Sequence, residues 1–262
     1  MVSSLWRHRQ LILQMTKREV IGRYKGSIMG LLWSFLNPLF MLVVYTFFFS
    51  VVFKAKWGAG DESKTQFAVV LFAGMIVHSL FADILNRAPG LILANTNYVR
   101  KVVFPLETLV AIAAGAALFH ALASLSVLLL AFVVFNGYMH WTVVFLPLIF
   151  LPLVLLALGC AWILASIGVF ARDVGQVVNV LTTVLLFLSP VFFPISSLPP
   201  LLRPWIMLNP LTFIIEQTRS VLVWGQLPNW SGLGIYLVCA CVFAWLGYAW
   251  FQKIRKGFAD VL

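Results

Sequence analysis

The stretch VFFPISSLPPLLRPWIMLNPLTF, residues 191–213, decides how the C-terminal part of the chain folds. It is apolar enough to enter a membrane, yet it carries five prolines, at positions 194, 199, 200, 204 and 210. Each proline lacks a backbone N–H and disrupts the helical turn before it. The stretch therefore cannot form one straight spanning helix, and its apolar residues exclude a free external loop.

The composition around this stretch is that of an integral membrane protein. Of the 262 residues, 62% are hydrophobic and 10% are charged, and the mean hydropathy is +1.01, whereas about a quarter of the residues in a soluble domain are charged. The runs 26–53 and 108–171 contain no Asp, Glu, Lys or Arg, and a bilayer crossing needs about 20 apolar residues. We therefore expect an all-α membrane protein with one domain over residues 1–262.

Six spanning helices fit the apolar runs. We expect them near residues 30–53, 67–86, 107–135, 142–170, 175–193 and 231–252. An even number places both termini on one side, and most of the 18 Lys and Arg residues would lie on that side. By the positive-inside rule that side is the cytoplasm. The formal charge of +10 thus reports orientation and does not indicate binding to nucleic acid.

Residues 1–25 form a basic segment ahead of the first span. On a helical wheel Leu5, Trp6, Ile12, Leu13 and Val20 share one side, although Arg9 intrudes on that side. This pattern predicts an amphipathic helix lying on the inner membrane surface. A frayed basic tail is the alternative.

Three glycines recur where this segment meets the first span. Gly22, Gly26 and Gly30 are spaced by four residues, and on a helix they would form a flat ridge that another backbone can approach closely. We therefore expect them to have a helix-packing role.

Few ionisable residues fall within the expected spans. Asp83 lies four residues before Arg87, which predicts a local ion pair. His78 and His120 are expected to be neutral and bonded to neighbouring helices. These residues form no charged pathway, which argues against a carrier coupled to protons or sodium ions.

The sequence does not indicate an enzyme. It contains no phosphate-binding loop of the form G-x-x-x-x-G-K-S/T, so if ATP drives the protein, ATP and Mg²⁺ bind to a partner and this chain binds no cofactor. Cys160, Cys239 and Cys241 lie inside apolar runs and suggest neither a disulfide framework nor a metal site. No nucleophile with a base and no pair of carboxylates has a catalytic spacing.

Residues 92–109, ILANTNYVRKVVFPLETL, are too polar to span a membrane and too apolar for a free loop. Tyr98 and Phe104 offer an apolar face, Arg100 and Lys101 offer charge, and Pro105 ends the helix. This combination predicts docking into a groove of a cytoplasmic partner. A loop lying on lipid headgroups is the alternative.

Four motifs in one order cover nearly the whole chain. They are RYKGSIMGLLWSFLNPL (23–39), NTNYVRKVVFPLE (95–107), FARDVGQ (170–176), and SPVFFP followed by LNP (189–210). Together they resemble the permease subunit of ABC exporters for polysaccharides, a type-two ABC permease family that includes exporters of O-antigen, capsule and teichoic acid. The resemblance implies a homodimer of six-span subunits that binds two copies of a separate ABC ATPase. It also implies export of a lipid-linked glycan across the inner membrane, with O-antigen favoured.

The resemblance assigns roles to residues in three regions. It implies that residues 1–22 touch the ATPase, that residues 95–107 form the coupling segment and that residues 170–176 form a second inner contact. The coupling residues would be Tyr98, Arg100, Lys101, Phe104, Pro105, Arg172 and Asp173. Residues 194–225 would fold as a re-entrant pair of short helices that forms a gate. The gate residues would be Pro194, Pro199, Pro200, Pro204, Trp205, Asn209 and Pro210.

Aromatic residues make up 15% of the chain, and a glycan can slide along aromatic rings without tight directional bonds. The candidates for such a channel wall are Phe35, Phe40, Tyr45, Phe187 and Phe192, with plain packing as the alternative for each. An exporter of a drug or another lipid is a second interpretation of the same fold. A membrane-embedded glycan-modifying enzyme is a third, and His78 with Asp83 would be its best catalytic pair.

Overall fold

The computed structural model describes residues 1–52, 64–100 and 104–261, and within these ranges the chain is helical with no strand. The helices longer than ten residues are α2 (Arg9–Arg23), α3 (Trp33–Tyr45), α4 (Lys64–Arg87), α6 (Glu107–Asn136), α7 (Leu146–Phe170), α8 (Val174–Leu188), α10 (Pro210–Leu222) and α11 (Trp230–Ile254). The shorter ones are α1 (Val2–Arg7), η1 (Gly30–Leu32), η2 (Thr46–Val52), η3 (Ala88–Gly90), η4 (Leu93–Asn95), α5 (Thr96–Arg100), η5 (Trp141–Phe145), η6 (Ile195–Ser197), α9 (Arg203–Met207), η7 (Arg255–Gly257) and α12 (Phe258–Val261).

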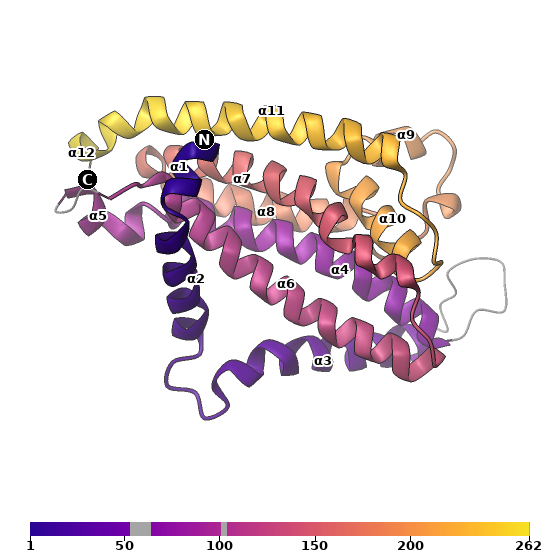
Figure 1. The fold of residues 1–262 in the computed structure, drawn as a ribbon. Coiled ribbons are helices and arrows are strands. Elements are labelled where there is room, and N and C mark those ends of the chain that lie inside the picture. Colours follow the sequence, from indigo (N-terminus) through magenta and orange to yellow (C-terminus); the bar gives the residue numbers. More distant parts are fainter. Residues whose placement is uncertain (53–63, 101–103, 262) are drawn as a thin grey trace.

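Most of the long helices run along the length of the molecule, which gives it two ends (Figure 1). Both termini, α1, α5 and α12 lie at one end, called here the terminal end. The short helix α9 and the turn between α6 and α7 lie at the other, called the hairpin end. α2 runs across the terminal end, roughly at right angles to the bundle, and α3 lies along one edge, where it packs mainly on α6.

Five helical segments among the described residues are long and apolar enough to cross a membrane, so the chain is a multi-pass membrane protein. They are Gly30–Phe49, Gln66–Gly90, Glu107–Asn136, Trp141–Phe170 and Trp230–Gly257. Their positions agree with five of the six spans expected from the sequence. Long charge-free runs therefore located these helices correctly.

The fifth expected span, residues 175–193, is shorter in the structure. α8 has 15 residues and ends at Leu188, because Ser189 takes an extended conformation with φ −99° and ψ 150°. Proline disfavours the helical conformation of the residue before it, and Pro190 follows Ser189. The predicted C-terminal limit of this helix was thus wrong by five residues.

The N-terminal segment is helical as expected, but its apolar residues do not share one environment. Leu5, Ile12 and Val20 pack against the bundle, whereas Trp6 and Leu13 are each 68% exposed. The main contact partner of this segment is α6. The helix therefore turns part of its apolar surface toward the protein and part away from it.

The expected glycine ridge is wrong. α2 ends at Arg23, and Gly26 and Gly30 have positive φ values of 89° and 51°, which the right-handed helix does not contain and glycine adopts readily. The three glycines therefore lie at the end of α2 and in the turn that leads into α3. No described heavy atom lies within 4 Å of where a Cβ would sit on Gly22, Gly26 or Gly30.

Close helix packing through glycine occurs instead between α7 and α11. A Cβ on Gly159 would lie 2.9 Å from the Phe243 carbonyl oxygen, and one on Gly247 would collide with the backbone of Gly159. Small residues at such crossings let two membrane helices approach closely. α7 and α11 accordingly form the most extensive helix pair of the bundle.

Candidate functional site

The described part of the expected coupling segment, residues 95–107, lies at the terminal end (Figure 1). The Tyr98 and Phe104 rings stack with their centroids 4.4 Å apart and their planes 13° from parallel, and both rings are half-buried. Pro105 follows directly, and its carbonyl oxygen accepts a 2.7 Å hydrogen bond from Thr108 Oγ1 in the first turn of α6. α5 ends at Arg100, and Lys101 falls outside the described residues.

A recess of about 520 Å³ lies beside this segment. Its walls come from α2, the end of α4, the coupling segment and the start of α6, and include Arg18, Glu19, Arg87, Asn95 and Tyr98. This recess is lined by both charged and aromatic side chains. It therefore offers a partner both apolar contact and charge.

Ion pairs tie α2 to α4 next to this recess. Arg87 pairs with Glu19 of α2 and, at 3.9 Å, with Asp83 one turn earlier, which confirms the predicted local pair. Arg23 at the end of α2 also lies 3.9 Å from Asp83. The N-terminal helix is thus held to the helix that leads into the coupling segment.

The second expected inner contact, residues 170–176, joins α7 to α8. Arg172 and Asp173 are both exposed there. α7 and α8 pack against η3, which follows α4 and precedes the coupling segment. The structure therefore brings the two expected contact regions to the same end of the molecule.

Glu107 joins both termini at this end, which the sequence did not reveal. Its side chain is buried and accepts a 2.8 Å hydrogen bond from Ser4 Oγ and a 3.1 Å bond from Arg255 Nη1. Its backbone carbonyl accepts a bond from Trp162 Nε1 at 3.1 Å. The sequence feature that could have indicated this contact is an acidic residue, Glu107, just after Pro105.

The expected gate segment forms a pair of helices, α9 and α10, at the hairpin end (Figure 1). Pro204 and Pro210 stand in the first turns of these helices, where a missing N–H costs nothing. Pro194 precedes η6 in an extended conformation, and Pro199 and Pro200 are exposed between the short helices. All five prolines therefore lie at helix starts or in connections.

Asn209 links the two helices of this pair to α8. Its Oδ1 accepts a 2.9 Å hydrogen bond from the Leu211 backbone and caps α10. Its Nδ2 donates to Ser189 Oγ at 2.9 Å and to the Leu188 carbonyl at 3.2 Å. Trp205, another expected gate residue, is 70% exposed on α9.

Arg219 of α10 is fully buried at the hairpin end. It donates to the Val70 carbonyl at 3.0 Å, to the Pro190 carbonyl at 2.6 Å and to the Val191 carbonyl at 3.1 Å. Glu216 pairs with it at 2.8 Å. The guanidinium thus binds α4 and the segment after α8 to α10.

Arg219 falls between the fifth and sixth expected spans, and the sequence alone does not predict that it is buried. Burial of an ionised side chain is costly unless it is paired and hydrogen-bonded, and charged residues at membrane depth commonly mark functional positions. The sequence feature that could have indicated this contact is a Glu–Arg pair three residues apart, Glu216 and Arg219, in a helix with no other charged residue.

The five aromatic candidates for a channel wall do not form one surface. Phe187 and Phe192 stack at 5.9 Å, and Phe192 stacks in turn on Phe49 at 6.2 Å. Phe35 and Phe40 are exposed on α3. Tyr45 faces α4 instead, with its ring centroid 6.4 Å from that of Phe72.

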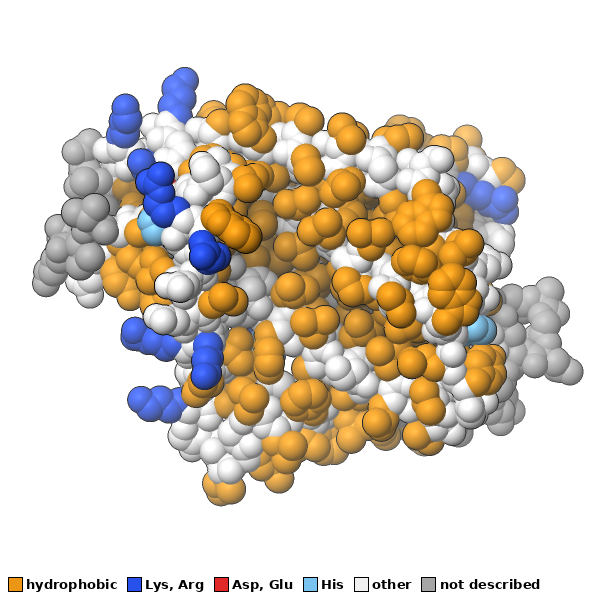
Figure 2. Space-filling view, viewed as in Figure 1, with side chains coloured by type: hydrophobic (Ala, Val, Ile, Leu, Met, Phe, Trp, Pro, Cys, Tyr) orange, Lys and Arg blue, Asp and Glu red, His pale blue; other side chains and the backbone are white. Residues whose placement is uncertain are grey.

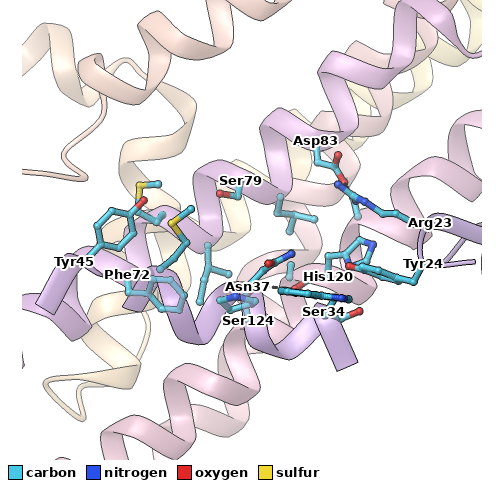
Figure 3. A pocket seen from close by; sticks show the side chains of 18 residues that line it. Arg23, Tyr24, Ser34, Asn37, Tyr45, Phe72, Ser79, Asp83, His120 and Ser124 are labelled. Carbon is cyan, nitrogen blue, oxygen red and sulfur yellow. Dashed lines mark hydrogen bonds and ion pairs between the residues drawn. The ribbon is translucent and has the colours of Figure 1, made fainter. Parts of the chain in front are cut away.

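Tyr45 lines a cavity of about 410 Å³ between α3, α4 and α6. Figure 3 shows Tyr45 and Phe72 at one end and Arg23, Asp83 and His120 at the other. We call this space the α3 cavity. The predicted contact of His78 with a neighbouring helix is confirmed nearby, because its Nε2 bonds the Thr182 carbonyl of α8 at 2.9 Å, whereas His120 meets the Tyr24 ring edge-on at 5.9 Å.

The family model for ABC-2 type transporters matches residues 10–223. The chain belongs to the ABC-2 type transporter family. Members of this family are membrane permeases, and the permease itself lacks ATPase activity, as the missing phosphate-binding loop predicted. The motifs found along the sequence therefore led to the correct family.

Curated members of the ABC-2 family align with the chain almost from end to end. The O-antigen export system permease protein RfbA of Myxococcus xanthus is 27% identical over 99% of this chain and 98% of its own length. The polysialic acid transport protein KpsM of Escherichia coli is 26% identical over 90% of both chains. The capsule polysaccharide export inner-membrane protein CtrC of Neisseria meningitidis serogroup A is 22% identical over 98% of this chain and 95% of its own.

Proposed function

We propose that this chain is the membrane-spanning subunit of an ATP-driven exporter that moves a lipid-linked polysaccharide, most closely an O-antigen, outward across the inner membrane. The observation that carries the proposal is the end-to-end alignment with export permeases for O-antigen, polysialic acid and capsule. The O-antigen permease of Myxococcus xanthus shares 27% of its residues with this chain, which favours O-antigen among these glycans.

The terminal end is the cytoplasmic end in this proposal. Figure 2 shows hydrophobic side chains over the middle of the visible face and most of its Lys and Arg side chains at the terminal end. The positive-inside rule assigns such an end to the cytoplasm. α8 then completes six crossings, and α9 and α10 enter and leave on the outer face as a re-entrant gate.

Two copies of a separate ATPase, which bind ATP and Mg²⁺, would contact the terminal ends of a permease homodimer. The stacked Tyr98 and Phe104 rings and the adjacent recess supply an apolar contact, while Arg172 and Asp173 supply exposed charge. Movement of the coupling segment would reach α6 directly, because Pro105 immediately precedes it. The Phe187 and Phe192 pair remains a candidate for the glycan path.

Deletion of the gene in its host tests the function. We expect loss of a surface polysaccharide and accumulation of its lipid-linked form inside the cell, both reversed by the intact gene. Unchanged surface glycan would contradict the exporter proposal. Co-purification should also recover an ATPase subunit whose activity depends on this chain.

A substitution at Phe104 tests the coupling assignment. Phe104→Asp should reduce export at least tenfold while the permease still inserts, because a charge replaces the apolar ring that stacks on Tyr98. Phe104→Leu keeps an apolar side chain and should retain most export. Normal export by the Asp variant, measured as surface glycan per cell, would remove this segment from the coupling site.

Cysteine labelling tests the gate topology. Single cysteines at Leu198 and Leu227, in a chain lacking Cys160, Cys239 and Cys241, should react with an impermeant thiol reagent added from outside. Labelling of either position from the cytoplasmic side alone would make residues 194–225 a crossing.

A further inference from the structure

The α3 cavity has the size of a ligand site. Its volume of about 410 Å³ lies within the range of roughly 300–1,000 Å³ typical of small-molecule pockets. It exists because α3 packs mainly on α6 and makes few contacts with α4. It lies inside one subunit, on the side of α3 opposite to Val43.

The chemistry of the lining changes along the cavity (Figure 3). Aromatic and thioether side chains, including Tyr45 and Phe72, line one end. Polar groups from three elements line the other end and the middle: Ser34, Asn37, Ser79, Asp83, His120 and Ser124. Such a concentration of hydroxyl, amide and imidazole groups inside a membrane bundle is costly without polar partners.

Ser34 supplies an independent indication of a ligand. Its hydroxyl is buried, with 3% of the residue exposed, and it has no hydrogen-bond partner within the described residues. Buried polar groups without partners are rare in folded proteins and call for an explanation. The hydroxyl is enclosed by protein in this structure, so the Ser34 side chain must rotate into the cavity before a ligand hydroxyl can bond Ser34 Oγ.

The charges of the site disfavour an ionic ligand. Arg23 and Asp83 face each other at 3.9 Å, so the single cation among the described lining residues already has an acidic partner. A phosphate would meet the Asp83 carboxylate, and a cation would meet Arg23. An uncharged molecule that both donates and accepts hydrogen bonds fits this set better.

We propose that the α3 cavity binds a sugar unit of the exported glycan within a single permease subunit. A sugar ring carries hydroxyls for Ser34, Asn37 and Asp83 and an apolar C–H face for the aromatic lining. The inference rests on the proposed export function and adds a specific binding site to it. Ser34 and Asn37 act here as binding residues for a neutral carbohydrate.

Photocrosslinking in intact cells that make the glycan tests the site. A photoreactive amino acid replaces Met41, which lines the cavity and is 52% exposed, or Val43, which is similarly exposed at 58% but does not line the cavity. Cells are fed a radiolabelled monosaccharide, and sugar attached to the permease is counted after irradiation. We expect at least fivefold more labelled sugar at position 41 than at position 43.

Serine variants separate binding from stability. Ser34→Ala should lower the sugar adduct at position 41 about five- to tenfold, the effect of one hydrogen bond, without lowering the melting temperature, because the hydroxyl has no protein partner to lose. Ser124→Ala and Ser126→Ala form a matched pair: each hydroxyl bonds the carbonyl four residues earlier, but Ser124 alone of the two lines the cavity. Of these two variants, only Ser124→Ala should lower the sugar adduct at position 41.

The outcomes distinguish this inference from the export function. Phospholipid or polyprenyl adducts without sugar at position 41 would overturn the carbohydrate site, as would equal adduct yields in the Ser34→Ala and Ser126→Ala variants. If surface glycan still depends on the gene in those experiments, the exporter proposal stands while the cavity inference fails. If no surface glycan depends on the gene, both fail.

Discussion

Each end of the bundle contains a buried ionisable side chain that joins distant segments, and the distant partners of the two side chains differ in kind. Glu107 at the terminal end binds side chains, the hydroxyl of Ser4 and the guanidinium of Arg255. Arg219 at the hairpin end binds three backbone carbonyls from α4 and from the segment after α8. The partners of Glu107 belong to the two terminal regions of the chain, whereas those of Arg219 belong to the bundle itself.

This difference bears on which end can move. Arg255 is 43% exposed, so water can hydrate its charge when the bond to Glu107 opens. The carbonyls around Arg219 are buried with it and would lose their hydrogen bonds if it left, at a cost of about 1–3 kcal/mol for each unsatisfied group. The contact at the terminal end can therefore open and close more readily than the contact at the hairpin end.

The largest expected effect is at Arg219. Arg219→Met should lower the free energy of unfolding by about 3–5 kcal/mol, because it removes a buried charge that pairs with Glu216 and leaves carbonyls unsatisfied. Arg203→Met is the matched control: Arg203 also donates to two carbonyls, at 2.9 and 3.0 Å, but on the exposed surface. Similar melting temperatures for the two variants in detergent would contradict a structural role for Arg219.

A smaller loss of stability is expected at Gly74, where α4 leaves space for the Arg219 guanidinium. A Cβ on Gly74 would lie 2.9 Å from Arg219 Nη2 and 3.4 Å from Val191 Cα, so Gly74→Ala should cost about 1–3 kcal/mol of stability through overpacking. Gly234→Ala, in α11 with no described atom within 4 Å of the new Cβ, should leave the melting temperature unchanged or raise it. Equal behaviour of both variants would mean that this packing is loose.

Glu107→Gln should have a still smaller effect, about 1–2 kcal/mol, because it keeps a hydrogen-bonding side chain and loses the charge that faces Arg255. The loss should shrink in high salt, since Arg255 is partly exposed and its interactions are screened. The effect of Arg219→Met should not depend on salt. Thermal unfolding at low and high ionic strength compares the two ends directly, and an equal salt dependence would remove the distinction between them.

The smallest effect is expected at the N-terminus. Ser4→Ala removes one hydrogen bond to Glu107 and should cost about 0.5–1.5 kcal/mol. Ser3→Ala, on an exposed position of the same helix, should cost nothing measurable. A difference between them in protease resistance of the N-terminal segment would show that Ser4 holds α1 against the bundle.

Local sequence patterns predicted the spans and the family but not the buried contacts. Charge-free runs of about 20 residues identify membrane helices regardless of their neighbours. The four-residue spacing of Gly22, Gly26 and Gly30 suits a helix equally well, and only the backbone shows that two of them have positive φ. The end of α8 was predictable in principle, because Pro190 restricts the residue before it.

The environments of individual polar residues depend on segments far apart in the sequence. Arg219 bonds a carbonyl 149 residues away, and Glu107 bonds a side chain 148 residues away. The α3 cavity likewise combines Ser34, Asp83 and His120 from three different helices. The periodicity of apolar residues within one segment cannot reveal such long-range contacts.

The length of α8 matters for the lipid around the protein. Its 15 residues rise about 22 Å, against a hydrocarbon core of roughly 30 Å. The crossing proposed for α8 thus has a hydrophobic mismatch, which a membrane relieves by thinning or a protein by covering the exposed helix end. Leu201, Trp205 and Leu208, on and beside α9, follow α8 in the chain and are exposed, so we expect them to contribute apolar surface beyond its end. We therefore expect the hairpin end to respond more strongly to bilayer thickness than the terminal end.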